Sequence, residues 1–171
     1  MTRANAETLV NRQHAVAAVL ATWLILTSPW VTMLAKVPQR AGFFDYAHIV
    51  TGFLAMLISV SYTISCVRDG GWRLYFPWAS GSFGAVGRDV AGLLRGRLPS
   101  AEGGGLFAMV EGLLLVAFIV TAVSGAAWAL NQGTDLAMAW RAHHILAART
   151  FAGLLVLHVL AVASHLVDFV R

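Results

Sequence analysis

The chain has 171 residues, of which 58% are hydrophobic and only 12% are charged, and its mean hydropathy is +0.72. Soluble domains carry about 25% charged residues, so this composition excludes an ordinary soluble domain and predicts a membrane protein. The net charge is +4, most of the basic residues belong to one side of the membrane, as the predicted elements show below, and no nucleic-acid partner is expected.

A helix needs about 20 mostly apolar residues to cross a bilayer. Four segments without a charge meet or approach this length, at 13–35, 46–67, 112–134 and 150–167. The last segment is short, so its helix is expected to begin near Leu136 or Trp140 and to include Arg149. The first is too long for a signal peptide. The sequence therefore predicts an all-α, integral membrane four-helix bundle, with residues 1–171 as a single transmembrane domain.

Lys and Arg near the ends of spans are retained in the cytoplasm and so indicate orientation. One side would carry eight of them: Arg3, Arg12, Arg68, Arg73, Arg88, Arg95, Arg97 and Arg171. The opposite side would carry three: Lys36, Arg40 and Arg141. The sequence thus predicts that both termini are cytoplasmic and that the protein lies in the bacterial inner membrane, in contact with membrane lipid.

The loop between the second and third spans contains the segment FGAVGRDVAGLLRGRLP, residues 83–99. Val86, Val90 and Leu93 share one face of a helix drawn through it, while Arg88 lies elsewhere. This pattern predicts a short interfacial helix between helices two and three, on the inner surface of the membrane. A solvated loop with some apolar residues is the alternative.

Histidines fall at two depths of the predicted bundle. His144 and His158 are 14 residues apart, which is about 21 Å along a helix and about 40° from alignment, so they share a face but cannot bind one metal ion together. Helices one and two cross in opposite directions, which brings His14 near the inner level with His158 and His48 near the outer level with His144. Two His/His pairs are what two b-type haems require as axial ligands.

Cys66 is the only cysteine and there is no C-x-x-C-H motif, so any haem would be non-covalent. The alternative for any one histidine is a packing residue that forms a hydrogen bond to another helix. Agreement of four histidines on two levels favours haem ligation. His143 and His165 are assigned the packing role, with His165 as an alternative partner for His14 because it shares a face with His158.

Glycine and arginine residues near the histidines could support a macrocycle. Gly52 and Gly153 would give it room, although glycines in membrane helices often serve close packing. Arg12 and Arg141 could pair with haem propionates, or lie at the boundary without such a role. Arg149 falls inside the fourth helix, where a charge is usually functional or paired, and a propionate or Glu111 could be its partner.

Five segments together resemble the bacterial di-haem b-type membrane cytochromes, including cytochrome b561 and the gamma subunits of formate dehydrogenases. They are RQH (12–14), DYAHIVTG (45–52), GRDVAGLLRGRLP (87–99), RAHHILA (141–147) and LHVL (157–160). The resemblance implies ligands on helices one, two and four, and its 14-residue spacing on helix four selects His144 over His143.

The resemblance also implies an electron-transfer subunit of a membrane oxidoreductase complex rather than a complete enzyme. A partner redox subunit, such as an iron–sulfur protein, would deliver electrons to the outer haem, and the inner haem would pass them to a quinone. The long loop between helices two and three favours this kind over a stand-alone cytochrome b561-type quinone reductase. One departure concerns the quinone site, where an Asn-Ala-Gly-Gln-Lys-like segment of the family is replaced by FAMVE (107–111).

Two other classes of protein were weighed against a cytochrome. A histidine-lined transporter of metal ions or protons would also place His and Arg in the membrane, but the chain shows no internal repeat or pair of broken helices typical of transporters. A purely structural anchor is the remaining alternative, and it leaves the two histidine levels unexplained.

Overall fold

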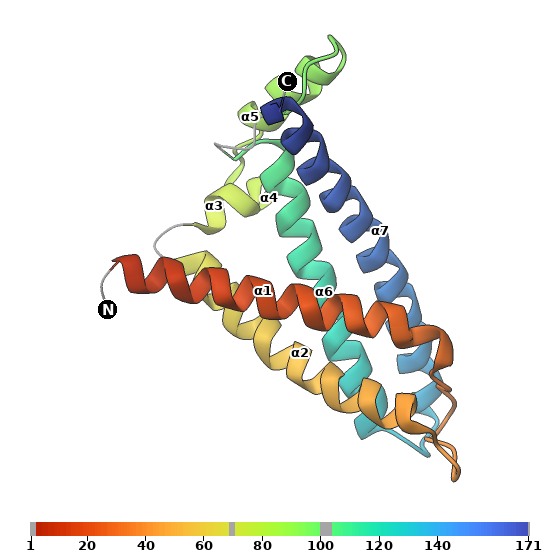
Figure 1. The fold of residues 1–171 in the computed structure, drawn as a ribbon. Helices are drawn as coiled ribbons and strands as arrows, with labels where there is room; N and C mark the ends of the chain where they lie inside the picture. Colours follow the sequence, from red (N-terminus) through yellow and green to blue (C-terminus); the bar gives the residue numbers. More distant parts are fainter. Residues whose placement is uncertain (1–2, 69–70, 100–103, 171) are drawn as a thin grey trace. The chain divides into compact units, whose positions relative to one another are not determined.

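The computed structural model describes the backbone of residues 3–68, 71–99 and 104–170, and the side chains of residues 7–68, 71–99 and 104–163. These residues form helices and turns, with no strand among them (Figure 1). In chain order the helices are α1 (Arg3–Thr27), the 3₁₀ helix η1 (Ser28–Trp30), α2 (Phe43–Val67), α3 (Trp72–Tyr75), α4 (Pro77–Ser80), α5 (Gly84–Leu93), α6 (Leu106–Leu130) and α7 (Leu136–Val170). The all-α prediction is confirmed.

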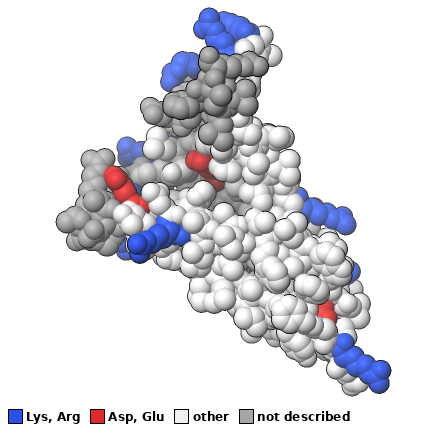
Figure 2. Space-filling model, in the orientation of Figure 1, with Lys and Arg blue, Asp and Glu red and all other residues white. Residues whose placement is uncertain are grey.

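Four helices in the described part of the chain are long and apolar enough to cross a membrane. Their spans are Glu7–Trp30, Phe43–Val67, Leu106–Leu130 and Leu136–Ala163. Most of the surface visible in Figure 2 carries neither basic nor acidic side chains, as expected for helices that face lipid. The protein is therefore a multi-pass membrane protein, and the four predicted spans are confirmed.

The chain divides into two compact units. The first unit comprises Met1–Ser65 and Ala117–Thr150, and the second comprises Cys66–Val116 and Phe151–Arg171. The first unit thus contains α1, α2, the C-terminal part of α6 and the N-terminal part of α7. The second contains the short helices α3, α4 and α5 with the remaining parts of α6 and α7.

Helix α1 differs from the predicted segment 13–35 at both ends, because it begins at Arg3 and ends at Thr27. Pro29 explains the early end, since proline has no N–H to donate and its ring clashes with the carbonyl four residues earlier. The hydroxyls of Thr27 and Ser28 donate to the carbonyls of Trp23 and Ile25 at 2.7 and 2.8 Å. The second bond satisfies the carbonyl of Ile25, whose amide partner four residues on would be Pro29, which has no N–H.

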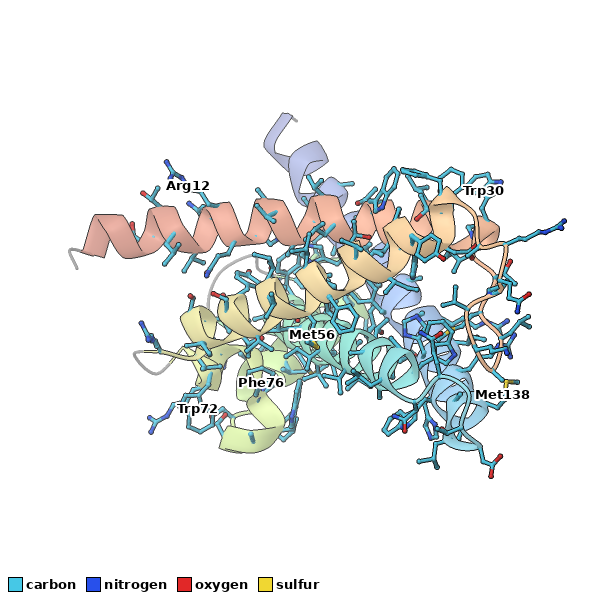
Figure 3. All side chains as sticks on the ribbon, turned by 90° about the horizontal axis from the view of Figure 1, so that it is seen from below. Arg12, Trp30, Met56, Trp72, Phe76 and Met138 are labelled. Carbon is cyan, nitrogen blue, oxygen red and sulfur yellow. The ribbon has the colours of Figure 1, made fainter. Side chains whose placement is uncertain are left out.

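Helices α1 and α2 lie side by side in the first unit (Figures 1 and 3). Small side chains allow this close approach, since Ala17, Ala21, Ala55 and Ser59 are all buried. Near the N-terminal end of α1, the Nε2 amide of Gln13 donates to the hydroxyl of Ser61 at 2.7 Å. Packing by small residues and hydrogen bonds between helices is typical of membrane bundles.

The loop between η1 and α2 is fixed by hydrogen bonds from the end of α6 and the start of α7. Trp128 donates its indole N–H to the carbonyl of Leu34 at 2.8 Å, and the Nε of Arg141 donates to the carbonyl of Met33. Asp45, buried in the first turn of α2, accepts the N–H groups of Thr32 and Gly42. The loop therefore forms an ordered cover at this end of the first unit.

In the second unit, α6 begins at Leu106, six residues before the predicted segment. The uncharged segment stops at Glu111, but a helix can include one acidic residue in its first turns. Asp89 of α5 accepts the N–H of Leu106 at 2.7 Å and so caps the start of α6. A helix is confirmed within residues 83–99, since α5 occupies Gly84–Leu93, while its place at the membrane interface stays a prediction. The sequence analysis did not predict α3 and α4.

Candidate functional site

The first unit brings together two of the predicted ligands, His48 of α2 and His144 of α7. Their ring centroids are 6.4 Å apart and the rings are perpendicular. Two imidazoles that bind one metal ion from opposite sides, each with a bond of about 2 Å to the metal, place their centroids about 6 Å apart. The separation between these rings therefore suits two axial ligands of one iron atom.

A hydrogen bond to helix α6 fixes the protonation of His144. Its Nδ1 lies 2.9 Å from the carbonyl oxygen of Thr121, and because a carbonyl can only accept, Nδ1 carries the proton. The other nitrogen, Nε2, then keeps its lone pair and can bind a metal, as in most histidine ligands of metals. The hydroxyl of Ser124 donates to the same carbonyl at 2.9 Å and lies 3.5 Å from Nδ1.

Gly125 allows the His144 ring to rest directly on α6. A Cβ at this position would lie 2.9 Å from Cε1 and 3.0 Å from Nδ1 of His144, closer than nonbonded atoms approach. No haem ligand was predicted on helix three, and the sequence did not indicate Thr121, Ser124 or Gly125 as part of the site. Their common face on an otherwise apolar helix is the signal that could have indicated them.

His48 completes this level of the site. Its Nδ1 is buried and has no hydrogen-bond partner among the described residues, which is uncommon for a buried polar atom. One turn further along α2, a Cβ built at Gly52 would meet no atom within 4 Å, so close helix packing does not account for this glycine. A buried polar atom without a partner and open space beside it both fit a bound planar group that the chain itself does not supply.

His14 lies at a different level of the first unit. Its ring is exposed and its centroid is 5.9 Å from the ring of Tyr62 on α2, at an angle of 38°. Tyr62 follows His48 by 14 residues in the same helix, which is about 21 Å along the axis. His14 therefore cannot share a metal ion with the pair formed by His48 and His144.

His158 belongs to the second unit, where its ring centroid is 5.6 Å from that of Phe107 on α6. The Nδ1 of His158 is buried. Beside Gly153 of the same helix, a Cβ would meet nothing within 4 Å, as at Gly52. The pairing of His14 with His158 joins residues of the two units and stays a prediction.

The remaining histidines were assigned no ligand role. His143 is exposed, and its Nδ1 donates to the carbonyl of Ala139 in its own helix at 2.7 Å, while its ring contacts Trp140 at 5.8 Å between centroids. This environment is that of an exposed residue whose contacts lie within its own helix. The side chain of His165 lies outside the described residues, so its assignment stays a prediction.

The three arginines predicted beside the haems differ in their surroundings. Arg141 is partly exposed, and its Nε is bonded to the carbonyl of Met33. Arg12 is exposed and projects from the side of α1 that faces away from α2 (Figure 3). Arg149 is exposed on α7, and its pairing with Glu111, a residue of the other unit, stays a prediction.

In the second unit the FAMVE segment packs against helix α3. A Cβ at Gly112 would lie 1.9 Å from the carbonyl oxygen of Tyr75, so this glycine serves close backbone packing, unlike Gly52. Burial, together with the Cys66 thiol and the Glu111 carboxyl nearby, raises the pKa of the Tyr75 hydroxyl above its usual value. Glu111 lies one helical turn after Phe107 on α6, and Phe107 contacts the ring of His158. The FAMVE segment is therefore close to a predicted haem ligand.

Among the described side chains, no group of three or more histidine, cysteine, aspartate or glutamate residues gathers into a metal site. The metal chemistry that the first unit offers is that of two opposed imidazoles, which fits the iron of a non-covalent haem. The four spans define a multi-pass membrane protein, and this pair has the separation expected of two axial ligands of a haem iron.

Comparison with known families places the chain more closely. The family model of prokaryotic cytochrome b561 matches residues 7–167, and the chain belongs to this family. Comparisons with curated proteins and with solved structures gave no match. The protein is therefore a membrane electron-transfer protein that binds b-type haem, and the resemblance found in its sequence is confirmed.

Proposed function

We propose that this cytochrome is the membrane-anchoring di-haem subunit of a respiratory complex and passes electrons across the bilayer between a partner redox subunit and the quinone pool. The observation that carries this proposal is the opposed pair of His48 and His144, 6.4 Å apart between ring centroids, with His14 at a second level about 21 Å away along α2. One level supports a single haem, whereas two levels provide a path across the membrane.

In this proposal His48 and His144 hold the outer haem, and His14 and His158 hold the inner haem. The iron of a haem with two imidazole ligands carries one electron without opening a coordination position to substrate. The chain contributes fixed ligand geometry, since the hydrogen bond from His144 to Thr121 and the contact with Gly125 hold the ring in place. Fixed ligands reduce the rearrangement that accompanies each change of charge.

Other residues of the chain would shape the two haem environments. The open space beside Gly52 and Gly153 gives room for the macrocycles. Arg12 and Arg141 would pair with propionates, and Arg149 with a propionate or with Glu111. These roles are supported by the place of each residue near a ligand in the sequence.

The proposed orientation puts both termini and the 68–105 loop in the cytoplasm, with the protein in the inner membrane as a single bundle. Eight basic residues of twelve on that side support it. The partner subunit would then meet the outer haem, and quinone would react near the inner haem and the half-buried Glu111. Reporter fusions after Arg171 and within residues 99–105 test the orientation, and periplasmic activity at either point would reverse it.

The number of haems is the direct test of the proposal. A pyridine haemochrome assay on the purified, fully loaded protein is expected to give two non-covalent b haems per chain. One haem or none would contradict the two-level arrangement. If the protein holds a single low-spin haem and His144→Ala removes it, the protein has one haem site, formed by His48 and His144.

A further inference from the structure

Helix α5 and the turn after it form a groove in the second unit. The groove has a volume of about 750 Å³ and lies within residues 84–98, a size common for sites that bind small molecules. Three arginines line it, Arg88, Arg95 and Arg97, together with Asp89. Figure 2 shows basic side chains gathered at this segment, at the top of the view.

The turn after α5 exists because of a glycine. Gly96 has a φ of 72°, a left-handed conformation that favours glycine. The N–H of Gly96 donates to the carbonyl of Leu93, and the N–H of Arg97 donates to the carbonyl of Gly92, both at 3.0 Å. This pair of bonds is the usual way in which a glycine ends a helix, and here it turns Arg97 back beside α5.

The floor of the groove is open because it consists partly of glycine. A Cβ built at Gly87 would meet no atom within 4 Å, and Gly84 and Gly92 also line the groove. A side chain at Gly92 would instead approach Arg97, whose Cβ is 3.8 Å away. The groove is therefore lined by the backbone of the α5 glycines and by the side chains of three arginines.

The acidic lining residue is already engaged. The Oδ2 of Asp89 accepts the N–H of Leu106 at the start of α6, where the partial positive charge of a helix N-terminus stabilises a carboxylate. Arg88, Arg95 and Arg97 are exposed and form no ion pair or hydrogen bond through their side chains with any other described residue. No described side chain neutralises their three positive charges, which an anionic ligand could pair with.

Exposed leucines flank the arginines. Leu93 and Leu98 are each 44% exposed and Leu94 is 86% exposed. A free inorganic anion would gain nothing from such neighbours, whereas a lipid places acyl chains beside its phosphate. Arginine also binds phosphate oxygens through two parallel N–H groups, which lysine cannot do.

We propose that the groove formed by Arg88, Arg95 and Arg97 binds the phosphate of an anionic phospholipid, and that the adjoining leucines contact its acyl chains. Binding of this lipid would tie α5, and through Asp89 the start of α6, to the membrane surface. The proposal needs only a membrane protein and is independent of the number of haems or of the electron acceptor.

Native mass spectrometry of the delipidated full-length cytochrome, titrated with phosphatidylglycerol or phosphatidylcholine, tests the proposal. Phosphatidylglycerol is expected to bind on the order of a hundredfold more tightly, since each of the three arginines near the lipid surface contributes roughly a fivefold gain in affinity. R88Q/R95Q/R97Q is expected to lose this preference. K36Q/R40Q/R68Q, which removes the same charge elsewhere, is expected to keep it.

A variant that keeps the charge distinguishes lipid binding in the groove from non-specific electrostatic attraction to the basic residues. Gly87→Leu leaves the charge unchanged and places a side chain in the open floor, so it is expected to weaken phosphatidylglycerol binding about as much as the triple arginine variant. Wild-type binding by Gly87→Leu, or equal affinity for the two lipids, would overturn the proposal. Displacement of the lipid by millimolar inorganic phosphate would assign the groove to the free anion instead. Retention of the haem absorbance bands shows that each variant is folded.

Discussion

The two histidine levels of the first unit are built differently. At the first, the His48 and His144 rings are perpendicular, with their centroids 6.4 Å apart, and His144 is bonded to Thr121 and rests on Gly125. At the second, His14 is exposed and contacts the ring of Tyr62, with no hydrogen bond to its ring among the described residues. Contacts with α6 therefore hold the ring of His144, whereas His14 has only its contact with Tyr62 among the described residues.

This difference suggests that the two haems would depend on the protein in different ways. At the first level the imidazoles have a separation suited to an axial pair, so a haem bound there would gain affinity from preorganisation. At the His14 level, part of the binding free energy would be used to order the ligand. Four variants test whether the two levels differ in this way.

The largest expected effect is that of His144→Ala. Removal of a ligand from the preorganised pair should eliminate one low-spin haem or convert it to high spin, so that the haemochrome ratio falls from two per chain toward one. His143→Ala, the neighbouring exposed histidine, is the matched control and should retain both. The comparison fails if His144→Ala keeps two low-spin haems while His143→Ala loses one.

His14→Ala is expected to remove the inner haem and leave the spectrum of the outer haem unchanged, because the two levels are about 21 Å apart along α2. Oxidation of the reduced protein by a soluble quinone analogue, followed by the haem bands, should then slow by more than tenfold. Equal rates for wild type and His14→Ala would indicate a different electron acceptor, such as a second cytochrome.

Gly125→Ala should have a smaller effect on the outer haem. Its Cβ would lie 2.9 Å from the His144 ring, so the ring must move from its ligand position, and affinity for the outer haem should fall by roughly tenfold. Haem titration of the apoprotein measures this. Val123→Ile adds the same single carbon to an exposed residue of α6 and is expected to bind haem as the wild type does; a similar loss in both would point to a general weakening of the helix.

The smallest expected effect is that of Ser124→Ala. This change removes a hydroxyl that donates to the carbonyl bonded to His144, so both haems should stay low-spin while the midpoint potential of the outer haem shifts. Potentiometric titration of the absorbance bands resolves the two haems. A shift confined to the inner haem would contradict the assignment of His144 to the outer level.

Much of the architecture followed from the sequence because membrane segments obey a simple rule. The cost of burying charge in lipid makes apolar segments visible without any knowledge of packing, and the four spans were found in this way. The helix ends were less accurate, because they depend on local chemistry. Pro29 ends α1 eight residues before the predicted limit. The start of α6 is capped by Asp89, which belongs to α5 and is 17 residues away in the sequence.

The sequence by itself determined the class of protein, the four spans and the idea of two histidine levels, because composition and the helical repeat of 3.6 residues are properties of the chain alone. The tertiary structure decided how one level is built. Only packing brings the carbonyl of Thr121 to His144, places Gly125 under the His144 ring and leaves open space beside Gly52. The first two contacts join residues 23 and 19 positions apart, and the third depends on which neighbours the fold does not place there. A backbone carbonyl has no signature in the sequence, and for this reason the residues that orient the haem ligand could be found only in the fold.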